Sequence, residues 1–139
     1  MSRYVGMLQA IQTAIFGGML GRVENLVFAE AFDDLLEQAD YLSAEGYFLA
    51  AGVLGRAVLE EHLRKLCGAV NCLPQKPRAT LNDYNSSLYD NKQLTKIEMK
   101  HIDALAAIGN NAAHNQPVTQ EDVGRLLRDL RQFLGQHPP

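Results

Sequence analysis

The sequence has few of the features that mark an exported, disulfide-bonded or nucleic-acid-coating protein. Among its 139 residues there are only two cysteines, too few for a disulfide framework. Lys and Arg number 13 against 16 Asp and Glu, which gives a formal net charge of −3. This acidic balance argues against a protein that coats nucleic acid through a general basic excess, although it allows a local basic groove.

The sequence also lacks an apolar run long enough to cross a bilayer. The most apolar stretch near its start, residues 1–20, contains Arg3 and is interrupted by Gln9, Gln12 and Thr13. No small-residue cleavage pattern follows it, so a signal peptide is not indicated. We therefore expect a cytoplasmic protein without membrane contact, in a reducing compartment that keeps both cysteines as thiols.

Common motifs of catalysis and cofactor binding are missing as well. The glycines at 17, 18 and 21 lack the Lys-Ser/Thr pair and the preceding strand of a phosphate-binding loop, and neither H-E-x-x-H nor G-x-S-x-G occurs. His62, Cys67 and Cys72 are closely spaced, but a fourth ligand is not nearby, so we interpret the two cysteines as buried thiols. We expect no cofactor and no metal.

What the sequence does contain is apolar periodicity of the helical kind, with no convincing strand. This periodicity predicts one domain over residues 1–139, an all-α antiparallel bundle of five or six helices. Helices are expected over 1–20, 23–42, 47–67, 80–89, from Thr95 to before Pro117, and from Thr119 to about 135, with a tail at 136–139 that frays. The first of them is amphipathic, and its Leu8, Ile11 and Ile15 would serve as an interface.

Three details of this bundle are specific enough to check. Residues 47–67 have apolar side chains around most of the helix and small residues at Gly52 and Gly55, which is typical of a central helix. Thr80 and Thr119, each followed three residues later by Asp, predict helix N-termini. The apolar faces of the last two helices are expected to comprise Ile97, His101, Leu105, Ile108 and Ala112, and then Val123, Leu126, Leu127, Leu130, Phe133 and Leu134.

One polar cluster stands out near the end of the penultimate helix, in the segment Gly109–Asn115. In a helix, Asn110 and Asn111 lie four and three residues before His114, so both can share its face. A histidine flanked by amides can act as a general acid or base, or can orient a phosphate group. The simpler interpretation is that His114 and Asn115 only end the helix, with the imidazole near its last carbonyl groups.

Two sequence blocks carry a resemblance to a known family. Residues 50–67, AAGVLGRAVLEEHLRKLC, followed after a loop and a short helix by residues 108–114, IGNNAAH, resemble the HEPN superfamily. More narrowly, they are similar to its uncharacterised bacterial branch, whose second block reads iGN-x-aaH. The resemblance spans about Phe32 to Phe133. It implies a helical bundle, often a homodimer, that acts in toxin–antitoxin pairs or anti-phage defence, frequently through metal-independent RNA cleavage.

The chain departs from the nuclease motif of that family, in which an arginine precedes the histidine by a few residues. Here Ala107, Ile108 and Gly109 occupy the matching positions, and no Lys or Arg lies between His101 and His114. Cleavage by the 2′-hydroxyl builds negative charge on the phosphorus, which a guanidinium would stabilise. Arg56 on the small-residue helix is the best substitute. Alternatively, Arg56 belongs to a surface ladder with Glu60 and Arg64.

Two functions from different classes therefore stay open. The first is a metal-independent endoribonuclease in which His114 is the acid or base, Asn110 and Asn111 position the phosphate, and Arg56 or a second subunit supplies the arginine. The second is a HEPN-like module with a degenerate nuclease motif that binds RNA, a second copy, a cognate antitoxin or a larger defence protein. Arg125, Arg128 and Arg131 could add a basic row for RNA, or simply form a solvated face.

Overall fold

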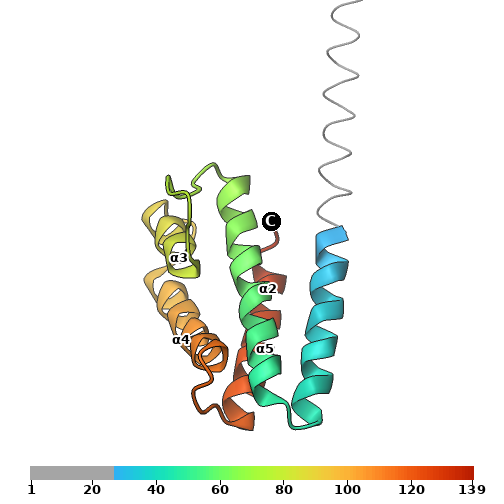
Figure 1. Ribbon diagram of the computed structural model, residues 1–139. Coiled ribbons are helices and arrows are strands. Elements are labelled where there is room, and N and C mark those ends of the chain that lie inside the picture. Colours follow the sequence, from blue (N-terminus) through green and yellow to red (C-terminus); the bar gives the residue numbers. More distant parts are fainter. Residues whose placement is uncertain (1–26) are drawn as a thin grey trace, which may run out of the picture. The chain divides into compact units, whose positions relative to one another are not determined.

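A computed structural model describes residues 27–139 of the chain, and all regular structure in this range is helical. A first helix covers residues 27–44, and four more follow: α2 (Phe48–Ala69), α3 (Leu81–Asp90), α4 (Lys96–Ala113) and α5 (Gln120–Gln136) (Figure 1). No strand occurs between residues 27 and 139. The predicted all-α fold is confirmed, whereas the helix expected over 1–20 lies outside the described residues.

The chain divides into two units between Asp33 and Asp34, and the second, Asp34–Pro139, contains α2 to α5. Within it α2 contacts α3, α4 and α5, which confirms its central position. Gly52 of α2 faces Ala112 and Arg56 faces Gly109, so α4 runs antiparallel to α2. Gly52 and Gly55 face Val123 and Leu126 in the same order, so α5 runs parallel to α2. α4 thus runs in the opposite direction to both α2 and α5.

Three helices begin in the same way, with a threonine that caps the first turn. The side chains of Thr80, Thr95 and Thr119 each accept a hydrogen bond from the main-chain N–H three residues on. The acidic side chain at that third position accepts in return from the threonine N–H, which completes a capping box. The caps predicted at Thr80 and Thr119 are confirmed.

The first four of the five described helices share one C-terminal geometry, which α5 lacks. In these four, a residue with left-handed backbone follows the last turn: Gly46, Asn71, Lys92 and Asn115, with φ angles of 88°, 55°, 60° and 55°. At each one, two main-chain N–H groups reach back to carbonyl groups of the last turn, the pattern of a Schellman motif. These turns satisfy carbonyl groups that a helix end otherwise leaves without partners.

The buried side of α2 is narrower than its sequence predicts. Its buried residues follow one side of the helix: Ala51, Gly52, Gly55, Val58, Leu59, His62, Leu63 and Cys67. Val53 is 42% exposed and Ala57 is exposed as well. The expectation that apolar side chains around most of α2 are buried is wrong for these two, which lie on a solvent-exposed side of the helix.

The buried face of α4 is rotated from the predicted one. Ile97 is 82% exposed and His101 is exposed, whereas Ile102, Leu105, Ala106, Gly109 and Ala112 are buried. Each four-residue step advances about 40° beyond a full turn, so a row read as i, i+4, i+8 drifts away from the core. The face predicted for α5 is confirmed from Val123 to Phe133, and Leu134 is only half-buried.

The tail that was expected to fray is held at His137. The Nε2–H of His62 donates to the main-chain carbonyl of His137 at 2.7 Å, and Nε2 of His137 lies 2.6 Å from Oε2 of Glu98. Two helices therefore anchor the residue that follows α5. No helix in the described range is both long and apolar enough to cross a membrane.

Candidate functional site

The candidate site lies where α2 and α4 cross at very short range. A Cβ atom added to Gly52 would lie 2.7 Å from the Cβ of Ala112, and one added to Gly109 would lie 2.6 Å from the Cβ of Arg56. Real Cβ contacts are essentially never this close, so the crossing requires glycine on one side at both points. Gly109 thereby lets the aliphatic part of Arg56 lie directly against α4.

Arg56 joins the two sequence blocks that carry the family resemblance. Its Nε–H donates to Oδ1 of Asn110 at 2.7 Å, across 54 residues of sequence. Its Nη1 donates to Oε2 of Glu60 at 3.2 Å, one turn further along α2. The Arg56 side chain is 28% exposed, so the guanidinium is held in place and still reaches the surface.

The hydrogen bond to Asn110 shows that Arg56 is more than a member of a surface ladder of ion pairs along α2. The expected pair of Arg56 with Glu60 is present, but Arg64 reaches Glu61 instead, at 2.5 Å. Arg64 lowers the pKa of the Glu61 carboxyl by hydrogen bonding and by its charge. The ladder interpretation therefore describes only part of what Arg56 contacts.

His114 is the C-cap residue of α4, one turn beyond Asn110. Its main-chain N–H donates to the carbonyl of Asn110 at 3.0 Å, and the residue is exposed. Asn115, directly after it, has the left-handed backbone that lets the chain turn away. The turn fixes the backbone of His114 while leaving the residue open to solvent.

Asn111 contributes to the same turn through its main chain. Its carbonyl accepts a hydrogen bond from the N–H of Gln116 at 2.7 Å, and the residue is exposed. The structure thus brings Arg56 and Asn110 into direct contact, with His114 one turn away on α4. None of the described interactions joins the Asn111 side chain to Arg56.

The arrangement can bind an oxyanion. Arg56 has five N–H donors, and the hydrogen bonds described for it use only Nε and Nη1. A guanidinium held by an amide oxygen is preorganised to receive a phosphate oxygen. The carboxylate of Glu60 competes for the same cation, so an anion has to displace it or bind beside it.

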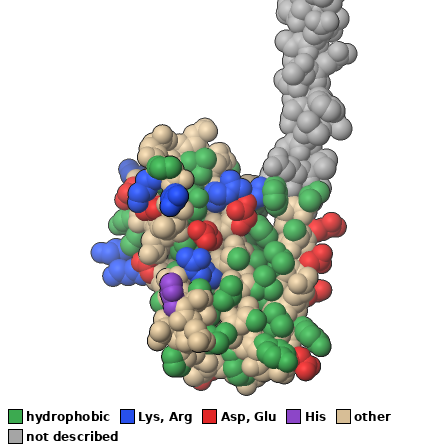
Figure 2. Space-filling view, viewed as in Figure 1, with side chains coloured by type: hydrophobic (Ala, Val, Ile, Leu, Met, Phe, Trp, Pro, Cys, Tyr) green, Lys and Arg blue, Asp and Glu red, His purple; other side chains and the backbone are tan. Residues whose placement is uncertain are grey.

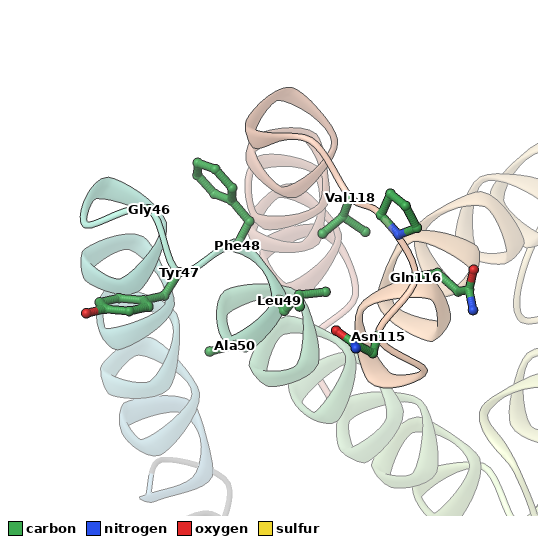
Figure 3. A pocket seen from close by; sticks show the side chains of 9 residues that line it. Gly46, Tyr47, Phe48, Leu49, Ala50, Asn115, Gln116 and Val118 are labelled. Atoms are coloured by element: carbon green, nitrogen blue, oxygen red, sulfur yellow. The ribbon is translucent and has the colours of Figure 1, made fainter.

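The hollow beside this site is apolar. It measures about 530 Å³ and lies between residues 46–50 and 115–118, the segment that directly follows His114 (Figure 3). Leu49 and Val118 point toward each other across it, whereas the Tyr47 side chain points away. With Leu49 and Val53 partly exposed on α2, this end of the molecule presents apolar surface next to the polar cluster.

The basic row on α5 is largely paired with acidic side chains. Arg131 contacts Asp40 at 2.5 Å, and Nε of Arg128 lies 3.7 Å from Asp129, which also contacts His101 at 2.9 Å. Asp129, four residues after Arg125, thus pairs with Arg128 and His101. These contacts favour the solvated-face interpretation for the row.

A cluster that sequence patterns did not predict, His62, His137 and Glu98, links α2, α4 and the end of α5. Burial lowers the pKa of His62, and its hydrogen bond to the His137 carbonyl only partly opposes this. Hydrogen bonds from Thr95 lower the pKa of Glu98, with a further contribution from His137. No local sequence pattern could have linked these residues, because His62 and His137 lie 75 residues apart.

Among the described residues, no three His, Cys, Asp or Glu side chains are grouped so that they could hold a metal ion. Comparisons of the chain with family models, with curated proteins and with solved structures found no match.

Proposed function

We propose that this chain is a HEPN-like helical module that binds RNA at the cluster of Arg56, Asn110 and His114. The observation that carries the proposal is the hydrogen bond between Arg56 and Asn110, because it places a guanidinium beside the block that lacks an arginine of its own. Such a cluster suits the phosphodiester group of a single strand. A role in a toxin–antitoxin pair or in anti-phage defence belongs to the same proposal.

RNA binding is tested by fluorescence anisotropy with a labelled single-stranded RNA at low salt. We expect Arg56→Ala to weaken binding about tenfold, since a phosphate contact is lost. Glu60→Gln should strengthen binding two- to threefold, because it removes the competing carboxylate while keeping a similar shape. Arg128→Ala is the matched control and should change the affinity little, as this arginine lies on the solvated face of α5.

Together, the two variants at the site distinguish an effect on RNA binding from an effect on folding. A loss in both Arg56→Ala and Glu60→Gln would indicate that the pair matters for folding, which circular dichroism would reveal. Equal affinity in wild type, Arg56→Ala and Arg128→Ala would contradict the proposed site. No binding by the wild type would contradict the proposed function.

A metal-independent endoribonuclease is the second candidate, and the exposure of His114 favours it. In such a reaction His114 would take the proton of the 2′-hydroxyl or give one to the leaving oxygen, and Arg56 would stabilise the charge on phosphorus. The assay is RNA cleavage in the presence of EDTA, comparing wild type with His114→Ala. Cleavage that survives unchanged in His114→Ala would eliminate this role.

The proposed module also binds a second copy of the chain. The apolar side of α2 that includes Leu49 and Val53 supports this, because both side chains are partly exposed beside the hollow at residues 115–118. Sedimentation velocity should show a dimer for the wild type and a monomer for Val53→Lys. Deletion of residues 1–20 tests the alternative interface predicted from Leu8, Ile11 and Ile15.

A further inference from the structure

The C-terminal end of α2 brings together the two cysteines of the chain. The N–H of Cys72 donates to the carbonyl of Cys67 at 2.9 Å across the left-handed turn at Asn71. In a Schellman motif, the residues at the two ends of this longer hydrogen bond commonly make a side-chain contact. Cys72 lies close enough to Cys67 to help raise the pKa of the Cys67 thiol.

The surroundings of the two thiols differ. Cys67 is fully buried, and its Sγ donates to the main-chain carbonyl of Tyr84 in α3 at 3.6 Å. Cys72 is 8% exposed, and its carbonyl accepts a hydrogen bond from the hydroxyl of Ser87. Both cysteines are free thiols. The pair therefore sits at the junction of α2, α3 and the connection between them, with Cys72 nearer to solvent.

We propose that Cys67 and Cys72 form a reversible intramolecular disulfide, with a small-molecule disulfide such as oxidised glutathione as the oxidant. The bond would close only six residues, and the two main-chain hydrogen bonds of the turn already hold the ends of this segment together. This proposal is independent of RNA binding.

The reaction proceeds by two thiol–disulfide exchanges. The deprotonated thiol of Cys72 attacks one sulfur of oxidised glutathione, which forms a mixed disulfide and releases one glutathione. Cys67 then loses its proton and attacks the Cys72 sulfur, which releases the second glutathione. The protein loses two protons and two electrons, and the oxidant becomes two glutathione molecules. Cys67 can then no longer donate to Tyr84. Oxidation therefore removes one hydrogen bond between α2 and α3 and adds a covalent bond between Cys67 and Cys72.

Burial of Cys67 makes the second exchange the slow one. Burial, reinforced by the neighbouring Cys72, raises the pKa of the Cys67 thiol to about 12. Only the thiolate attacks, so the second exchange should accelerate roughly tenfold for each pH unit in the range below that pKa. A mixed disulfide on Cys72 should therefore be visible near neutral pH and disappear faster at higher pH.

The test uses the full chain, both native and refolded from urea, in millimolar oxidised glutathione. Intact mass spectrometry should show a product about 2 Da lighter than the reduced protein, the mass of two hydrogens. Because the chain has two cysteines, this product identifies the bond without further mapping. In Cys67→Ser the exchange should stop at a glutathione adduct on Cys72, which gives the matched control.

The oxidised protein should keep the helical circular dichroism spectrum, melt about 4–8 °C higher and return to the starting state with dithiothreitol. Refolding is included because it removes the barrier of burial. Three results would overturn the proposal: free thiols on the refolded wild type, a glutathione adduct that persists on the wild type at pH 9, or an oxidised protein that melts below the reduced one.

Discussion

The imidazole of His62 is the buried ionisable side chain whose environment most directly links pH to folding. It is 2% exposed on α2, lies edge-on to the Phe133 ring and donates to the His137 carbonyl. Burial favours the neutral ring, so the pKa of His62 in the folded chain lies below its ordinary value of 6.5. The unfolded chain therefore binds a proton at a higher pH than the folded chain does.

We expect the free energy of unfolding to fall as the pH drops below about 6.5, toward the lower pKa of folded His62. The slope contributed by one such group is at most about 1.4 kcal/mol per pH unit. Urea unfolding between pH 7.5 and 5.5 measures it, above the range in which Glu98 begins to take up protons. His62→Gln cannot titrate and should flatten the curve; the same slope in both proteins would contradict this account.

Gly109 is the residue whose lack of a side chain most directly shapes the candidate site. Gly109→Ala would place a Cβ 2.6 Å from that of Arg56, and neither atom is the flexible end of a side chain. We expect a loss of about 1–3 kcal/mol in stability from the forced shift of α2 against α4, together with weaker RNA binding. Thermal unfolding and the anisotropy assay measure the two effects.

Gly124→Ala is the matched control within α5. A Cβ there would meet nothing within 4 Å, so the helix propensity of alanine should stabilise the chain by up to about 1 kcal/mol. If both substitutions had the same effect, the close crossing of α2 and α4 would not be the cause.

At the scale of elements, the helix ends explain why several polar residues stand where they do. Asn71 and Asn115 occupy left-handed positions, which asparagine tolerates better than most residues. The turn that ends α4 therefore accounts for the asparagine after His114. Lys92 holds the same backbone position after α3, where it has no such advantage.

Replacing Lys92 by glycine should stabilise the chain by about 0.5–1 kcal/mol, because glycine adopts positive φ angles without a steric cost. Gly46→Ala should do the reverse at the equivalent position after the first helix, where φ is 88°. Chemical denaturation of the two variants measures whether each substitution raises or lowers the free energy of unfolding. A destabilised Lys92→Gly protein would show that the lysine side chain contributes more than the backbone strain costs.

At the scale of the whole chain, charge is divided unevenly along the sequence. Residues 27–46 carry six carboxylates and no Lys or Arg, whereas residues 47–139 carry eleven Lys and Arg against nine Asp and Glu. Figure 2 shows Lys and Arg side chains on the face formed by the later helices. An RNA strand at the proposed site would therefore meet a small positive excess on residues 47–139 and be repelled by the carboxylates of residues 27–46.

If the chain binds RNA as proposed, neutralising carboxylates of the first helix, residues 27–44, should raise the affinity by reducing long-range repulsion. We expect Asp34→Asn with Glu37→Gln to strengthen binding two- to threefold at low salt, with the gain disappearing at high salt because exposed charges are screened. Anisotropy titrations at two salt concentrations measure this. A gain that is independent of salt would indicate a direct contact instead.

The sequence by itself determined the all-helical fold of residues 27–139 and the starts of two of its helices. Apolar periodicity and capping threonines act within a few residues of the chain, so the all-α fold, the starts at Thr80 and Thr119 and the buried row of α5 could be predicted from local chemistry alone. Local patterns also singled out the segment from Gly109 to Asn115. Local patterns could not identify the buried face of α4 correctly. Residues spaced four apart shift gradually around a helix, and only packing against a partner helix decides which of them are buried.

Only the tertiary structure decided which distant residues meet. The contact of Arg56 with Asn110 depends on two helices crossing at Gly109, and the anchoring of His137 depends on α5 running beside α2. These contacts follow from the relative placement of helices, which is set by packing over the whole core. Hydrogen bonds that join residues 54 and 75 positions apart leave no trace in local periodicity.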